Sequence, residues 1–143
     1  KMLRVIKRLK AASDVTIKAT FLGAHALPKE YKDNKDGYMD LVINEMLPIV
    51  AKERLADYVD IFCEEGYFTV ADTERLLKAA NELGLQSKTH VNQFNAIGGV
   101  KASVDLDALS EDNKLNYRLA ELGLMNSINR MEYPSYLMEL NQI

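Results

Sequence analysis

The chain has 143 residues with 18 basic and 21 acidic side chains, a net charge of −3, and is long enough for one domain with a substantial core. It contains no Lys/Arg cluster, so nucleic acid is not an expected partner, and no apolar run nears the ~18 residues of a membrane span. The single cysteine, Cys63, excludes an internal disulfide, and without a signal-peptide pattern it favours a cytoplasmic protein.

The first pattern along the chain is helical, because Leu3, Ile6 and Leu9 recur at a spacing of three. No Ser, Thr, Asp or Asn precedes it as an N-cap. Two interpretations remain open: the helix begins in a longer protein, or the terminus is frayed or trimmed.

Three β-rich runs follow, and helical patterns alternate with them. The runs are predicted at Thr16–Leu22, Tyr58–Cys63 and about residues 86–91. Short connections between alternating strands and helices are typical of βαβ units, so the sequence predicts an α/β fold with a parallel sheet. In such folds functional side chains gather at the carboxyl ends of the strands.

The helical patterns carry their own signals. They are predicted at about residues 38–54, from Thr69 to about Leu83, and through residues 100–106. Pro48 is expected to kink or reset the first helix because proline lacks the N–H donor. Thr69 can cap the second helix, with Asp72 three residues later and Gly84 as its stop.

Both histidines of the chain lie at predicted strand ends. His25 follows the first strand, Glu64 and Glu65 follow the second, and His90 lies at the end of the third. Imidazole and carboxylate groups at one rim suit a divalent metal or an acid–base pair. Each histidine can equally be a hydrogen-bonded structural residue, and the Glu pair a solvated one; Glu64 is the better candidate because it comes first.

Cys63 is expected to be a small buried strand residue, since strand alternation points it away from Glu64. Gln93 and Asn92 are ordinary loop residues by default, and Gly98-Gly99 lacks the spacing of a phosphate-binding loop.

Three longer motifs make the pattern specific. They are TFLGAHALPKEY at residues 20–31, DIFCEEGYF at residues 60–68 and KTHVNQFNAIGG at residues 88–99. Together, in order and with natural spacing, they resemble imidazolonepropionase, a metal-dependent hydrolase of the amidohydrolase superfamily, and the resemblance covers roughly residues 1–110.

The resemblance implies a (β/α)8 barrel of which this chain supplies about three parallel βα units. It also implies hydrolysis of a cyclic amide, 4-imidazolone-5-propanoate, to N-formimidoyl-glutamate in histidine degradation, with one zinc or iron ion. His90 matches a metal ligand, His25 and Gln93 match residues of the substrate pocket, and Glu64 matches a carboxylate expected to be catalytic.

The chain also departs from the family. The His-x-His pair that supplies metal ligands on the family's first strand has no counterpart here, and Asn113 stands where a histidine is expected. Residues 111–143 no longer resemble the family and are interpreted as a helical tail with one helix at about residues 114–124. A catalytic zinc usually takes three protein ligands, so the resemblance leaves the metal site incomplete.

Three hypotheses follow. The chain is the central portion of an imidazolonepropionase-like hydrolase, incomplete and inactive alone. Alternatively, it is a non-catalytic half-barrel that serves as a structural or self-associating module. A weaker third hypothesis is a related amidohydrolase with another cyclic amide substrate. A barrel needs about 250 residues, so the unpaired edges of a partial sheet predict association between copies or cover by other segments.

Overall fold

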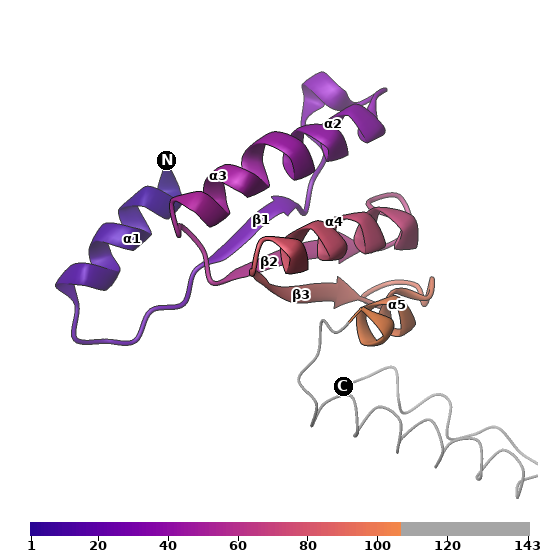
Figure 1. Cartoon of the computed structure of the whole chain (residues 1–143). Coiled ribbons are helices and arrows are strands. Elements are labelled where there is room, and N and C mark those ends of the chain that lie inside the picture. Colours follow the sequence, from indigo (N-terminus) through magenta and orange to yellow (C-terminus); the bar gives the residue numbers. More distant parts are fainter. Residues whose placement is uncertain (107–143) are drawn as a thin grey trace, which may run out of the picture. The chain divides into compact units, whose positions relative to one another are not determined.

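A parallel sheet of three strands, in the order β1-β2-β3, organises the part of the chain that the structure describes, residues 1–106 of a computed structural model (Figure 1). The strands are β1 (Thr20–Ala24), β2 (Tyr58–Cys63) and β3 (Gln86–Val91). The predicted α/β class and parallel pairing are confirmed, and β2 and β3 have the predicted bounds. The predicted boundary at residue 110, the tail, Asn113 and the helix at 114–124 lie outside the described residues.

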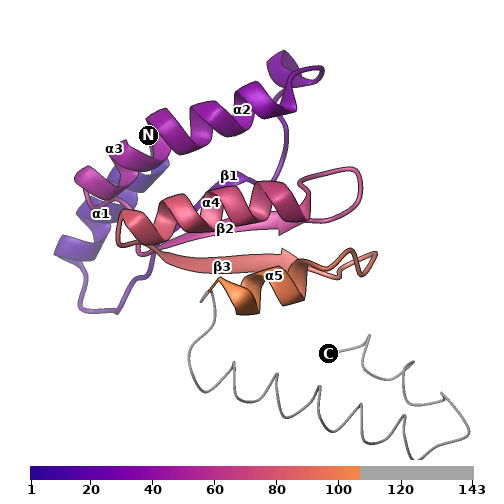
Figure 2. The ribbon, with the colours of Figure 1, turned by 45° about the vertical axis from the view of Figure 1, so that its right-hand side comes forward.

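The helices between the strands lie along one face of the sheet, while one further helix precedes β1 and another follows β3. Figure 2 shows α2, α3 and α4 running over that face, with α5 beside β3. The helical segments are α1 (Met2–Ala12), a 3-10 turn (Lys29–Tyr31), α2 (Lys35–Leu41), a π-helical turn (Val42–Met46), α3 (Leu47–Lys52), α4 (Val70–Glu82) and α5 (Gly99–Asp105). No helix among residues 1–106 is long and apolar enough to cross a membrane.

The core lies between the sheet and these helices. Val59 and Ile61 of β2 are fully buried against Leu76 and Leu77 of α4, together with Met39 of α2. Because side chains alternate along a strand, the intervening residues of β2 point to the opposite side. We call that opposite side, which no described helix covers, the open face; it carries Asp60, Phe62, Lys88 and His90.

Pro48 resets the helix as predicted, and the form of the reset is a π-helical turn. The amide of Leu47 donates to the carbonyl of Val42, five residues earlier, just before the proline that has no N–H to give. The chain continues as α3 in nearly the same direction as α2 (Figure 1). The predicted apolar positions Met39, Val42 and Val50 therefore all reach the core.

The helix α4 begins and ends as the sequence predicts. Thr69 accepts a hydrogen bond from the amide of Asp72, while the Asp72 carboxylate accepts from the amide and the hydroxyl of Thr69, which is a complete capping box. Gly84 follows the helix with a φ of +73°, a conformation that suits glycine.

The first helix differs from its prediction in one position. Leu3 and Ile6 are half-buried, and Leu3 packs against the core, but Leu9 is 53% exposed. Salt bridges instead fasten this end of α1, where Lys10 pairs with Asp57.

The strand β1 starts four residues later than predicted and contains an irregularity. It advances three residues from Phe21 to Ala24 while β2 advances only two, from Val59 to Ile61. The extra residue is a β-bulge, and it interrupts the alternation of side chains. Phe21 and Ala24 consequently both face the helices, and the next residue, His25, turns to the open face.

Candidate metal and active site

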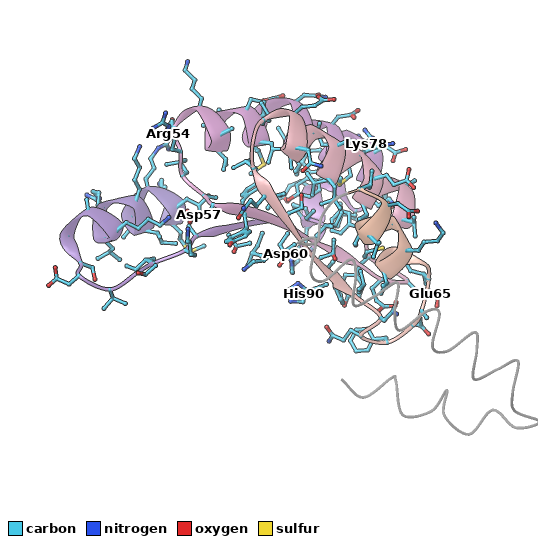
Figure 3. All side chains as sticks on the ribbon, turned by 60° about the horizontal axis from the view of Figure 1, so that its bottom comes forward. Arg54, Asp57, Asp60, Glu65, Lys78 and His90 are labelled. Carbon is cyan, nitrogen blue, oxygen red and sulfur yellow. The ribbon has the colours of Figure 1, made fainter. Side chains whose placement is uncertain are left out.

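Two histidines and one aspartate meet on the open face. His90 Nδ1 lies 3.0 Å from Asp60 Oδ2 and 3.1 Å from Oδ1, and His25 Nε2 lies 3.4 Å from Oδ1. The three side chains each offer a ligand atom within 4.8 Å of the others. Figure 3 shows Asp60 and His90 together beside the sheet. The predicted convergence of the two histidines at one rim is found in the structure.

The strands β2 and β3 supply Asp60 and His90, and His25 directly follows β1. Asp60 lies in the central strand β2, and its side chain is only 4% exposed. His90 lies in β3 and pairs in register with Phe62 of β2. His25 reaches the cluster from the far strand because the bulge in β1 turns it to the open face. The His25 and His90 rings contact edge to face at 4.9 Å between centroids.

The cluster has the chemistry of a metal site. Two imidazoles and a carboxylate are ligands that several divalent transition metals accept. His25 Nε2 is buried and forms no hydrogen bond within the described part of the chain. A buried nitrogen that lies near a carboxylate but forms no hydrogen bond is costly unless something else binds it, so the site fits a cation or a polar ligand group.

Asp60 was not among the residues singled out from the sequence. The signal that marks it is an acidic residue inside a strand whose other members are apolar or aromatic, Tyr58-Val-Asp-Ile-Phe-Cys63. A carboxylate buried in such a strand needs a partner. The two histidines meet that need.

Glu64 lies elsewhere than expected for a residue of the cluster. It is buried, and its carboxylate accepts hydrogen bonds from the backbone amides of Phe94, Asn95 and Glu65. These bonds, that from Phe94 first, hold the pKa of Glu64 below its usual range despite burial. Its neighbour Glu65 is exposed, well to one side of Asp60 and His90 (Figure 3).

The remaining candidates are placed as follows. Gln93 is exposed in the loop after β3, next to Asn92, whose φ of 55° is left-handed. Cys63 is fully buried, and burial raises the pKa of its thiol, so the prediction of a structural cysteine is confirmed.

Comparison of the sequence with those of known proteins identifies relatives of the chain. Over 113 residues, 79% of the chain, it is 66% identical to the imidazolonepropionase of Christiangramia forsetii. Over the same length it is 57% identical to that of Flavobacterium johnsoniae and 52% identical to that of Shewanella oneidensis. The chain corresponds to a segment of the imidazolonepropionase family. The resemblance seen in its motifs is confirmed.

The segment is short relative to the family. The chain spans about 28% of the length of each of these imidazolonepropionases. No family model matches the chain. The described residues thus correspond to part of one segment of these proteins, and that part contains the His25–Asp60–His90 cluster.

Proposed function

We propose that the chain is a sector of a (β/α)8 barrel and that the whole protein is a metal-dependent imidazolonepropionase. Its substrate would be 4-imidazolone-5-propanoate and its product N-formimidoyl-glutamate, a step of histidine degradation. The observation that carries the proposal is the convergence of His25, Asp60 and His90 at three adjacent parallel strands. High identity to proteins named imidazolonepropionase supports the choice of reaction.

The barrel is supported by the way the sheet is covered. The helices between the strands lie on one face of the sheet (Figure 2), as they do in the outer ring of a barrel. The His25–Asp60–His90 cluster lies on the other face toward the carboxyl ends of the strands, where the active sites of such barrels lie. With the order β1-β2-β3, the outer edges of β1 and β3 have no strand partner among residues 1–106. Further strands of the whole protein would pair there.

The cluster residues have distinct proposed roles. His90 would bind zinc or iron through Nε2, because Asp60 accepts a hydrogen bond from its Nδ1 and so fixes the ring and its tautomer. His25 and Gln93 would contact the substrate, as the resemblance implies. The bound ion would supply Lewis acidity and activate a water.

The 143-residue chain by itself would be inactive. Its described residues offer three ligand groups, and in the proposed roles only His90 binds the ion directly. Three protein ligands are typical of a catalytic zinc, so the others would come from the rest of the enzyme. The catalytic role of Glu64 that the resemblance implies is not part of this proposal, because its carboxylate accepts from the backbone amides of Phe94, Asn95 and Glu65.

A second function is favoured by a separate observation. Both sheet edges are unpaired within the described residues, and Leu22 and Phe94 are 54% and 64% exposed. Such edges and apolar side chains favour pairing between chains. The alternative is therefore a non-catalytic module that associates with copies of itself.

A chimera tests the first proposal. The matching 113 residues replace their counterpart in the C. forsetii enzyme, and release of N-formimidoyl-glutamate is measured by mass spectrometry. We expect activity within about tenfold of the parent, lost in His90→Asn and kept in the control Gln86→Ala, which changes another exposed residue of β3. A folded, metal-loaded chimera without turnover would refute the proposal and favour the self-associating module.

A further inference from the structure

The carboxylate of Glu64 accepts hydrogen bonds from three backbone amides and from the side chain of Asn95. Oε2 accepts from the amide of Phe94 at 2.9 Å, and Oε1 accepts from Asn95 at 3.0 Å and from Glu65 at 3.1 Å. The side chain is only 1% exposed. A carboxylate this deeply buried is tolerated when several donors satisfy it, and bonds of amides to a charged acceptor are stronger than those to a neutral one.

Two of these amides belong to the loop at residues 92–97, which directly follows β3. The loop begins with the left-handed Asn92 and continues through Gln93 to the two fastened residues. At its far end Gly99 lies against β3 and β2, since a Cβ there would be 2.7 Å from Val91 and 2.9 Å from Cys63. Glu64 thus binds the middle of this loop, between Asn92 at its start and Gly99 after its end.

The backbone of Glu64 is also fixed. The amide of Glu64 donates to the carbonyl of Phe68, and its own carbonyl accepts from the amide of Tyr67. Phe62 contacts the rings of both Tyr67 and Phe94, which joins the two loops a second time. The backbone that carries the Glu64 carboxylate is therefore held in place by contacts outside the loop at residues 92–97.

We infer that Glu64 is a positioning residue whose carboxylate fixes the loop at residues 92–97, and thereby directs Gln93 and the end of β3 that carries His90. It acts on the reaction through this loop and does not touch the substrate. The inference deepens the proposed hydrolase function and rests on it for the effect on turnover. The fastening of the loop stands on the hydrogen bonds alone.

The first test needs no activity. Amide hydrogen exchange of Phe94 and Asn95 is measured by NMR in the 143-residue chain, in Glu64→Gln and in the control Glu65→Gln. We expect both amides to be protected in the unchanged chain and in the control. In Glu64→Gln we expect their protection factors to fall by about tenfold or more. Unprotected amides in the unchanged chain would overturn the inference even if Glu64→Gln does not fold.

The second test uses the chimera with the C. forsetii enzyme. For a positioning role, Glu64→Gln raises KM by about tenfold, keeps both limbs of the pH profile of kcat/KM, and is partly rescued by Glu64→Asp. For a direct catalytic role, kcat falls at constant KM and one pH limb disappears, which would contradict the inference. If the unsubstituted chimera is inactive, the proposed function fails, while the exchange experiment still decides whether Glu64 fastens the loop.

Discussion

The imidazole rings of His25 and His90 contact each other edge to face, with 4.9 Å between their centroids, although they come from the two outer strands of the sheet. Both rings lie over the central strand because Asp60 is between them. Its carboxylate lies 3.4 Å from His25 Nε2 and 3.0 Å from His90 Nδ1. The aspartate is therefore the residue on which the geometry of the pair depends.

Replacing Asp60 by asparagine should weaken metal binding. Asparagine keeps the shape but loses the charge and the second acceptor oxygen, so His90 is no longer fixed, and we expect the Kd for Zn²⁺ to rise about 10- to 100-fold. Isothermal titration of Zn²⁺ into the metal-free chimera with the C. forsetii enzyme measures this. The control Asp40→Asn removes an exposed carboxylate that pairs with Arg75 and should leave the Kd unchanged; equal affinities for both variants would contradict the role of Asp60.

Replacing Leu76 by alanine should destabilise the fold strongly. Leu76 is fully buried between α4 and the sheet, and its removal leaves a cavity that costs about 2–5 kcal/mol. Urea unfolding monitored by circular dichroism gives the difference. Leu83→Ala, just beyond the same helix and 40% exposed, is the matched control and should cost far less.

Replacing Thr69 by alanine should cost about 1 kcal/mol of unfolding free energy, because the first turn of α4 loses its cap and Asp72 loses a donor. The matched change Ser13→Ala removes a hydroxyl that accepts from Val15 in an exposed segment, and little loss is expected. A loss as large in Ser13→Ala as in Thr69→Ala would show that the capping box adds nothing specific.

Acid should abolish the contribution of Glu64. Its pKa in the folded chain is held below the ordinary value of about 4.3 by the amides of Phe94, Glu65 and Asn95. The stabilisation is therefore complete above that ordinary value and is lost as the pH falls through the lower folded value. Urea unfolding from pH 7 to pH 3 should show Glu64→Gln less stable than the unchanged chain at pH 7, with a gap that narrows in acid. A gap that stays constant would contradict the assignment.

The elements with strong local signals could be predicted from the sequence. The strands β2 and β3 and the helix α4 are bounded by turn residues or caps next to them in the chain, and their limits were predicted closely. The start of β1 was wrong because Thr16 favours a strand by its side chain, whereas pairing with β2 begins only at Thr20. The start of β1 is therefore set by its pairing with β2 and not by the strand propensity of its residues.

The candidate site was predicted in part for a similar reason. Parallel strands bring their carboxyl ends to one rim, so the presence of His25 and His90 at the same rim could be predicted, whereas the face on which His25 lies depends on the bulge in β1. The involvement of Asp60 depends on burial, and the bonds of Glu64 depend on the path of the loop at residues 92–97. Those two facts are set by contacts far apart in sequence, which local patterns do not contain.

The bulge in β1 accommodates one extra residue, so that His25 follows Ala24 on the open face. Deleting one codon at Leu22 or Gly23 would restore strict alternation with Ala24 still opposite Ile61, and His25 would still turn toward Asp60. One codon inserted between Ala24 and His25 would instead turn the imidazole toward the helices, and could dismantle the cluster while every one of its side chains is still encoded. Scanning this strand by single-residue deletion and insertion would separate the effect of phase from that of side-chain identity.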